Sequence, residues 1–489
     1  MPDRTNGRVL FCLTLIFLCT GWACGRSSMD LEILPEPTQT LATLSKDRSV
    51  THNPSKRANG LIYITVDTLR ADMTSVYGNK EVRTPNMKYL AQNGQAFWNA
   101  IAQSSTTTPS HASMFTGLYL HDHNVYSNFE SLGDAPTTIA ETLKGNGFET
   151  FAMVNMRHLN PEVANLANGF DTYIKSGNMR RAEKTVDEFI KWIDKRKGKP
   201  FFAWLHLIDT HTPYRPPAPY DRLYYDDDEA DLRHRSMKDS WSLIPKNMRA
   251  HPLFQRWVTG VNDINWVIAQ YKGAVTYVDS QIGRLIDYLD KEKRLEETAM
   301  VVTADHGECL GEHNMYFVHT GLYDSTIRVP LITYFPGMPA RKRDVYDVVE
   351  MVDIFPTILE YFELPVQKSR GYSLLPRTVD QRKKKRIAYS EHAGKNLVAL
   401  RSKEYKYIRH IKTKHLQPAY PFSAGKEELY DLRADPDELI NLVKTHPDTA
   451  RLFREQLSMV DKSELSFASV KPKLTNETLS ALQALGYVR

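Results

Sequence analysis

The sequence has little cysteine, and most of it lies at one end of the chain. Four cysteines occur among 489 residues, and three of them fall within the first 24. Only Cys309 remains for the rest of the chain. An intramolecular disulfide framework is therefore excluded there.

The sequence also lacks a large excess of charge of either sign. The chain carries 63 Lys and Arg against 58 Asp and Glu, a formal charge of +5. Dedicated nucleic-acid binders concentrate far more basic charge on one face, so we expect no nucleic-acid binding. With 42% hydrophobic and 25% charged residues, the composition is that of a soluble globular protein. It excludes wholesale disorder, a fibrous repeat and a polytopic membrane protein.

The N-terminus lacks an apolar run of transmembrane length. The run at residues 9–18 follows Arg4 and Arg8 and is shorter than the roughly 20 residues that a spanning helix needs. A charged segment before a short apolar run is typical of a secretory signal. We therefore predict a signal peptide over residues 1–24 and an exported protein.

The end of this signal resembles a bacterial lipobox. Gly21-Trp22-Ala23-Cys24 would make Cys24 the lipidated first residue of the mature chain. A plain cleaved signal and an uncleaved anchor remain as alternatives. We expect the protein on the periplasmic or cell-surface side of a bacterial membrane, which it would contact only through this lipid.

Composition shifts divide the remaining chain into four parts. Residues 25–59 are rich in Pro, Ser and Thr and read as a flexible tether. The predicted parts after it are a catalytic domain at 60–376, with an insertion at 220–260, a subdomain of short alternating stretches at 377–445 and a helical tail at 446–489. The alternating stretches predict a small antiparallel sheet.

Three apolar runs predict buried parallel strands, at residues 61–66, 201–207 and 299–303. Helical patterns lie between them, for instance at 137–145 and 269–290. This alternation predicts an α/β fold with a doubly wound, mostly parallel sheet flanked by helices. Each run ends beside acidic residues or histidines: Asp67 after the first, Asp209 and His211 after the second, Asp305 and His306 after the third. In such sheets ligands bind at this carboxyl edge.

Several motifs, in order from about residue 60 to 445, resemble the sulfatase family of the alkaline phosphatase superfamily. They are Asp67-Thr68-Leu69-Arg70-Ala71-Asp72, Thr107-Thr108-Pro109-Ser110-His111, His206 to Tyr214, Asp305-His306-Gly307-Glu308, Arg328-Val329-Pro330 and Glu428 to Leu432. The resemblance implies an alkaline phosphatase-like fold and an arylsulfatase-like sulfuric ester hydrolase. Its substrate would be a small-molecule, glycan or lipid ester.

The resemblance also implies one divalent metal ion, held by Asp67, Asp305 and His306. Hard cations prefer such oxygen ligands, and Ca²⁺ is the ion expected from the family. A histidine in the set leaves Mg²⁺, Mn²⁺ and Zn²⁺ open. Thr68 stands where many sulfatases have a second acidic ligand.

Thr107 occupies the position at which sulfatases carry the Cys or Ser that becomes formylglycine. Threonine is not converted, so no formylglycine is expected, and water must resolve a threonine ester by attacking sulfur or phosphorus. We predict that Thr107 is the nucleophile. Phosphoryl transfer through threonine occurs in this superfamily, so a phosphomonoester, phosphodiester or phosphonate hydrolase remains an alternative. A catalytically inactive binding lipoprotein is another.

The remaining candidate residues also come from the resemblance. His211 matches a family histidine and is the leading general acid, while His319 stands near the place of a family lysine. His111 replaces the family arginine and is expected to contact the anion without a bidentate fork. Asp209 would be an extra metal ligand or would orient His211. Arg157 is a substitute for a missing substrate-binding lysine.

Overall fold

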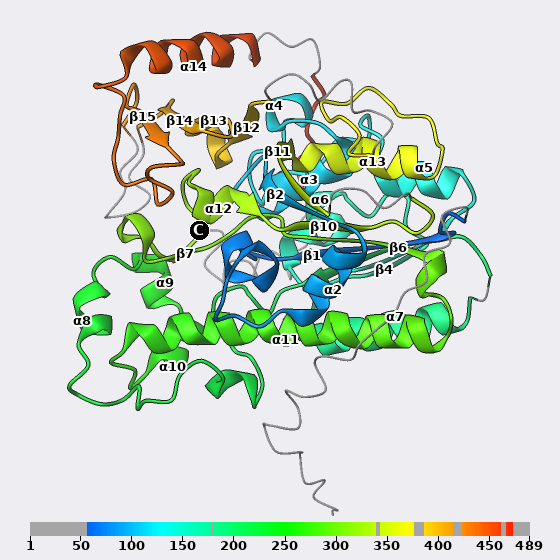
Figure 1. The fold of residues 1–489 in the computed structure, drawn as a ribbon, viewed down its shortest axis with the longest axis horizontal. Coiled ribbons are helices and arrows are strands. Elements are labelled where there is room, and N and C mark those ends of the chain that lie inside the picture. The colour runs from blue at the N-terminus through cyan, green and yellow to red at the C-terminus, as the bar shows by residue number, and fades with distance from the viewer. Residues whose placement is uncertain are drawn as a thin grey trace, which may run out of the picture. The chain divides into compact units, whose positions relative to one another are not determined.

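The computed structural model describes residues 56–177, 179–196, 198–338, 343–375, 386–413, 423–460 and 466–472 (Figure 1). The predicted signal peptide, Cys24 and almost all of the tether lie outside these residues. So does half of the predicted tail, at 461–465 and 473–489. All described residues belong to one unit, Thr43–Arg489. No helix within them is both long enough and apolar enough to span a bilayer.

A nine-stranded sheet forms the centre of the larger domain, in the order β11-β2-β10-β6-β1-β5-β3-β4, with β9 paired to β2. Its strands are β1 (Gly60–Val66), β2 (Gln95–Ile101), β3 (Glu149–Met153), β4 (Thr172–Ile174), β5 (Phe201–Leu207), β6 (Thr298–Thr303), β9 (Arg328–Val329), β10 (Leu331–Tyr334) and β11 (Asp344–Glu350). β1 is parallel to β5 and β6, and β10 is antiparallel to β6 and β2. The predicted mostly parallel sheet is confirmed.

Helices cover both faces of this sheet, because its central strands are apolar on both sides and must be buried on both. The longer helices are α2 (Pro85–Asn93), α3 (Thr107–Thr116), α5 (Ile139–Gly145), α7 (Ala182–Asp194), α11 (Ile264–Lys291) and α13 (Ile354–Tyr361). The helices α2 and α7 pack against α11 on one face, whereas α3, α5 and α13 pack together on the other (Figure 1). All residues of β1, β5 and β6 are buried.

Shorter elements connect these layers. The helices are α4 (Leu120–His123), α6 (Pro161–Ala164), α8 (Ser236–Ser240), α9 (Lys246–Ala250), α10 (Pro252–Val258) and α12 (Asp324–Ile327). The 3-10 turns are η1 (Ala71–Met73), η2 (Ser75–Tyr77), η3 (Arg157–Leu159), η4 (Tyr220–Arg222), η5 (Leu295–Glu297), η6 (Glu312–Asn314), η7 (Met351–Asp353) and η9 (Ala393–Lys395). A small hairpin joins β7 (Cys309–Leu310) to β8 (Tyr316–Val318). The segment predicted as an insertion contains α8 to α10.

A second, four-stranded antiparallel sheet follows, as the alternating stretches predict. It consists of β12 (Ala388–Glu391), β13 (Leu397–Arg401), β14 (Tyr405–His410) and β15 (Glu427–Asp431), in sequence order. Helix α14 (Pro447–Val460) covers it, with Phe453 stacked on Tyr407 at 6.0 Å between ring centroids (Figure 1).

Candidate metal and nucleophile site

The strand register brings the predicted metal ligands together at the carboxyl edge of the main sheet. Val66 pairs with Leu207 and Thr65 pairs with Thr303, so Asp67 leaves β1 beside the residues that follow β5 and β6. The ligand atoms of Asp67, Asp305 and His306 all lie within 4.8 Å of one another, and all three residues are buried. The predicted grouping of these three residues is therefore present.

The unsatisfied atoms of this cluster fit a cation. Within the described part of the chain, both carboxylate oxygens of Asp67 and Oδ2 of Asp305 have no hydrogen-bond donor. Buried carboxylate oxygens without donors are costly unless a positive charge lies between them. The other oxygen of Asp305 accepts from the backbone N–H of His306 at 2.9 Å, which leaves Oδ2 for an ion.

The tautomer of His306 also fits a metal ligand. Its Nδ1 lies 3.0 Å from the carbonyl oxygen of Gly307, which can only accept, so Nδ1 carries the hydrogen. The lone pair of Nε2 then faces the cluster, 3.4 Å from Asp305 Oδ2 and 3.9 Å from Asp67 Oδ1. Burial lowers the pKa of His306 to about 3, so the ring is neutral, as a metal ligand must be.

The two carboxylates repel each other in the absence of an ion. Burial and the neighbouring Asp67 raise the pKa of Asp305 above its usual range. Burial also acts to raise the pKa of Asp67, but His206, His211 and His306 outweigh it and the pKa is lowered. A divalent cation would allow both groups to be ionised together.

Thr107 lies at the rim of this cluster, at the start of α3. Its Oγ1 is 3.3 Å from His306 Nε2, so the hydroxyl and the ring nitrogen face the same volume. The positive end of the helix dipole favours negative charge at this place. The predicted nucleophile and the predicted metal ligands therefore form one constellation.

His111 does not take the place expected from the family arginine. Its Nδ1 lies 2.8 Å from the carbonyl oxygen of Thr107 and its Nε2 lies 3.1 Å from Thr65 Oγ1. The ring packs between Trp204 and His206, at 5.3 and 5.4 Å between centroids. With both nitrogens engaged and no exposed surface, the His111 ring has surroundings that favour a structural role over contact with an anion. Burial lowers its pKa to about 4.

His211 and His319 lie beside the cluster and are partly exposed. Their rings lie 5.8 Å apart, and the ring of His319 lies 4.4 Å from that of His306. His211 donates from Nδ1 to the carbonyl oxygen of Thr212 at 2.8 Å. Its other ring nitrogen, Nε2, takes no part in this hydrogen bond. The buried carboxylate of Glu308 lies 3.7 Å from His319 Nδ1. Although burial opposes it, this carboxylate raises the pKa of His319.

Two predicted residues have other surroundings. Asp209 Oδ2 accepts from the backbone N–H of Ala182 at 2.9 Å, so this carboxylate oxygen lies at the start of α7. Burial raises its pKa to about 7. Arg157 opens the turn η3 and is partly exposed, whereas the next residue, His158, is buried and lies near enough to Asp67 to feel its charge.

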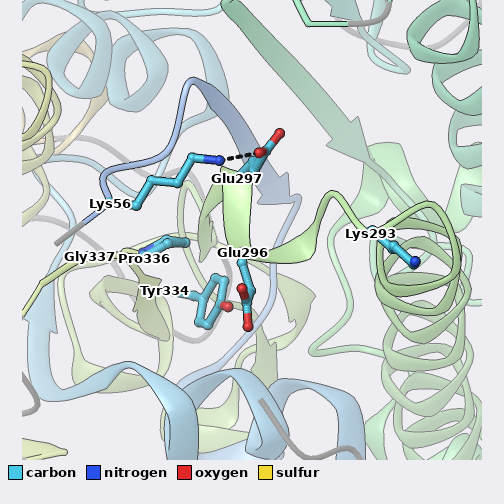
Figure 2. A pocket seen from close by; sticks show the side chains of 7 residues that line it. All are labelled: Lys56, Lys293, Glu296, Glu297, Tyr334, Pro336 and Gly337. Atoms are coloured by element: carbon cyan, nitrogen blue, oxygen red, sulfur yellow. Dashed lines mark hydrogen bonds and ion pairs between the residues drawn. The ribbon is translucent and has the colours of Figure 1, made fainter. Parts of the chain in front are cut away.

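A separate cavity of about 90 Å³ contains none of these residues (Figure 2). Its lining includes Glu296 and Glu297, which precede β6, and Lys56, which precedes β1. Lys56 and Glu297 form an ion pair (Figure 2). This cavity lies at the amino edge of the parallel strands, opposite the cluster.

Comparison with known proteins identifies the family. Residues 60–364 match the family model described as Sulfatase, and residues 311–463 match that of the N-sulphoglucosamine sulphohydrolase C-terminal region. The chain belongs to the sulfatase family. Chicken (Gallus gallus) arylsulfatase K is 26% identical over 490 residues, covering 88% of each chain. An arylsulfatase of Clostridium perfringens is 26% identical over 455 residues, covering 80% of this chain and 92% of the relative.

Solved structures confirm the alkaline phosphatase-like fold of this sulfatase. A phosphonate monoester hydrolase from Silicibacter pomeroyi gives a TM-score of 0.64 at 21% identity, covering 85% of this chain and all of that chain. A protein in complex with its substrate D-glucosamine-2-N,6-O-disulfate gives 0.63 at 22% identity, covering 83% and 97%. Family membership makes the chain a sulfuric ester hydrolase in reaction class.

Sequence reasoning missed three buried residues of this sulfatase site: His158, His206 and Glu308. His206 lies within the apolar run of β5, where it reads as one more core residue. Two signals were present: His206 opens one of the quoted motifs, and it is polar inside a strand that is otherwise apolar. Glu308 belongs to a quoted motif, but nothing in the sequence indicates that it faces His319.

Proposed function

We propose that this sulfatase-family chain hydrolyses sulfate esters with Thr107 as its nucleophile and without formylglycine. Support comes from one contact above all, the 3.3 Å between Thr107 Oγ1 and His306 Nε2, beside carboxylate oxygens that lack donors. Asp67, Asp305 and His306 would hold one divalent cation, for which Ca²⁺, Mg²⁺, Mn²⁺ and Zn²⁺ are the candidates. When bound, it would neutralise the non-bridging sulfate oxygens and favour the ionised hydroxyl.

The protein groups then divide the chemistry between them. Thr107 loses its hydroxyl proton to solvent, and its Oγ1 forms a bond to sulfur while the bond from sulfur to the ester oxygen breaks. The alcohol leaves with a proton from His211 or His319. Water next attacks the sulfur of the threonine sulfate and gives a proton back to that histidine, while the bond from sulfur to Thr107 Oγ1 breaks. Sulfate is released, and Oγ1 takes a proton from solvent to restore the hydroxyl. The start of α3 favours the negative charge throughout.

The same site supports a second candidate, the hydrolysis of phosphomonoesters, phosphodiesters or phosphonates. Thr107 itself favours it, because a threonine ester cannot collapse to an aldehyde as a formylglycine hemiacetal does. The attack of water on phosphorus would then release the product. The fold shared with a phosphonate monoester hydrolase is compatible with this reaction.

A sulfated sugar is the substrate class that the relatives suggest. An N-acetylglucosamine-6-O-sulfatase of Bacteroides thetaiotaomicron is 23% identical over 539 residues, covering 91% of this chain and 93% of the relative. We also propose that the chain works outside the cytoplasm, anchored through Cys24. Fractionation of wild type and Cys24→Ser tests this, since loss of the lipid would release the protein from the membrane.

A paired substrate screen tests the reaction. Aryl sulfate, aryl phosphate, a diaryl phosphodiester and an aryl phosphonate are each assayed with the four cations, using wild type and Thr107→Ala. Thr116→Ala is the matched control, because Thr116 is a buried threonine of the same helix whose hydroxyl donates to the Ala112 carbonyl oxygen. We expect sulfate turnover that Thr107→Ala abolishes and Thr116→Ala retains. Phosphoester turnover with the same dependence would establish the second candidate, and activity unchanged by Thr107→Ala would refute the nucleophile.

A further inference from the structure

Beside the proposed metal centre lies a second group of buried ligand atoms, in His111, His206 and Asp305. These atoms also lie within 4.8 Å of one another, close enough for them to ligate a second cation. The hydrogen bonds of the two histidines argue against it, because a ligand nitrogen must offer a lone pair.

His111 has no lone pair to offer. Its Nδ1 must carry the hydrogen, since the Thr107 carbonyl oxygen at 2.8 Å only accepts. Trp204 Nε1 donates to Thr65 Oγ1 at 2.9 Å, so the Thr65 hydroxyl passes its own hydrogen to His111 Nε2 at 3.1 Å. Both nitrogens are therefore used.

His206 has the opposite tautomer to His306. The backbone N–H of Asn155 donates to His206 Nδ1 at 3.3 Å, so in a neutral ring the hydrogen is on Nε2. Histidines that bind metal through one nitrogen donate from the other, as His306 is placed to do. The Nε2–H of His206 instead faces Asp67 Oδ2 at 3.4 Å. This contact is within ion-pair distance but does not have hydrogen-bond geometry, so His206 directs its N–H toward a proposed ligand without satisfying it.

Other residues fix His206 in this orientation. The side chain of Asn155 donates from Nδ2 to the backbone carbonyl oxygen of His206 and to Thr185 Oγ1. Its Oδ1 accepts from Arg180 Nε at 2.9 Å. A chain of contacts thus runs from Arg180 through Asn155 and His206 to Asp67.

We propose that His206 is a positioning residue of the metal centre, which it serves through Asp67 without touching the ion. By directing its Nε2–H at Asp67 Oδ2 from 3.4 Å, it would hold the carboxylate so that Oδ1, the oxygen nearer His306, faces the cation. The inference rests on the proposed metal site and adds that the site holds one ion. Partners of this kind in metal centres typically change affinity about 10- to 100-fold when removed.

The test uses two substitutions of His206, each of which can replace only one of the two ring nitrogens. The amide of His206→Gln can place a donor near the position of Nε2, whereas that of His206→Asn is shorter and reaches only the position of Nδ1. Mn²⁺ binding is measured by isothermal titration calorimetry on the full chain. His123 provides the matched control pair, since it is equally buried, accepts the backbone N–H of Val125 and contacts Ser113 Oγ at 3.0 Å.

We expect one Mn²⁺ per chain in wild type, a Kd about 10- to 100-fold higher in His206→Asn and a much smaller change in His206→Gln. Both His123 variants should bind as wild type does. Equal losses in the two His206 variants would overturn the proposal, as would a second Mn²⁺ in wild type that either variant loses. Wild type that binds none of the four cations would refute the metal site itself. If neither His206 variant folds, Arg180→Ala decides: a several-fold higher Kd supports the proposal, and an unchanged Kd overturns it.

Discussion

The side chain of His111 donates to the carbonyl oxygen of Thr107, one helical turn earlier, at 2.8 Å. The residue that stands in place of the family arginine therefore holds the backbone of the proposed nucleophile. Through Thr65 and Trp204 the same ring ties α3 to β1 and β5. Where the family motif has an arginine expected to contact the substrate anion, this chain has a neutral histidine that supports the backbone of Thr107.

Restoring the arginine should therefore fail. His111→Arg would bury a guanidinium among Trp204, His206 and Thr65, where no space or solvent is available. We expect the free energy of unfolding to fall by about 1–3 kcal/mol, as for an overpacked core, together with loss of turnover. Urea unfolding and steady-state kinetics measure both. A stable, more active variant would show that the position still contacts the anion.

Much of the fold follows from local patterns. The predicted helices at 137–145 and 269–290 correspond to α5 and α11, because their apolar spacing is helical. Asp67 and Asp305 could be placed at one edge because parallel strands end together. The surroundings of His111 and His206 could not be predicted in the same way, since they depend on which strands and helices pack against each ring. The helix-start contact of Asp209 likewise depends on where α7 begins.

His319 should act on the leaving group. Although burial opposes it, the Glu308 carboxylate raises the pKa of His319, which keeps the ring able to donate a proton near neutral pH. In His319→Gln we expect kcat/KM for alkyl sulfates to fall about 10²- to 10⁴-fold, the usual effect of losing a general acid. Aryl sulfates with good leaving groups should change far less.

The control for this prediction is His313→Gln, because the ring of His313 stacks on Tyr323 at 3.6 Å between centroids and its charged neighbours are not residues of the cluster. It should show no dependence on the leaving group. If His319→Gln slows aryl and alkyl sulfates equally, His319 has another role.

Buried histidines should make the cation-free protein sensitive to acid. Burial lowers the pKa of His111 to about 4 and those of His123, His158 and His306 to about 3. Between about pH 6.5 and 4 the unfolded chain binds protons that the folded chain does not. Each of these histidines should therefore lower the free energy of unfolding as the pH falls, by about 1.4 kcal/mol per pH unit. Asp209 and Glu438, whose pKa values are raised to about 7, act in the opposite direction.

His123→Gln tests this slope outside the proposed active site. It removes one such histidine, so the slope of unfolding free energy against pH should decrease by about 1.4 kcal/mol per unit in this window. Urea titrations at several pH values measure it. A variant with the wild-type slope would mean that His123 is protonated in the folded state.

The buried amine of Lys406 should stabilise the packing of the second sheet against the larger domain. Its Nζ lies 2.5 Å from Asp324 Oδ1 and 2.8 Å from Glu438 Oε1, linking β14 to α12. Asp324 also pairs with Arg401 and Arg328, so the group left uncompensated in Lys406→Met is Glu438. We expect a loss of about 3 kcal/mol in unfolding free energy at pH 8.

This loss should be smaller at lower pH. Burial and Asp324 already raise the pKa of Glu438 to about 7, and removing the amine raises it further. Glu438 can then take up a proton as the pH falls, so the difference between Lys406→Met and wild type should shrink from pH 8 to pH 6. Adding Glu438→Gln to the variant should recover part of the loss at pH 8. A loss that is independent of pH would instead assign the effect to packing of the lysine stem.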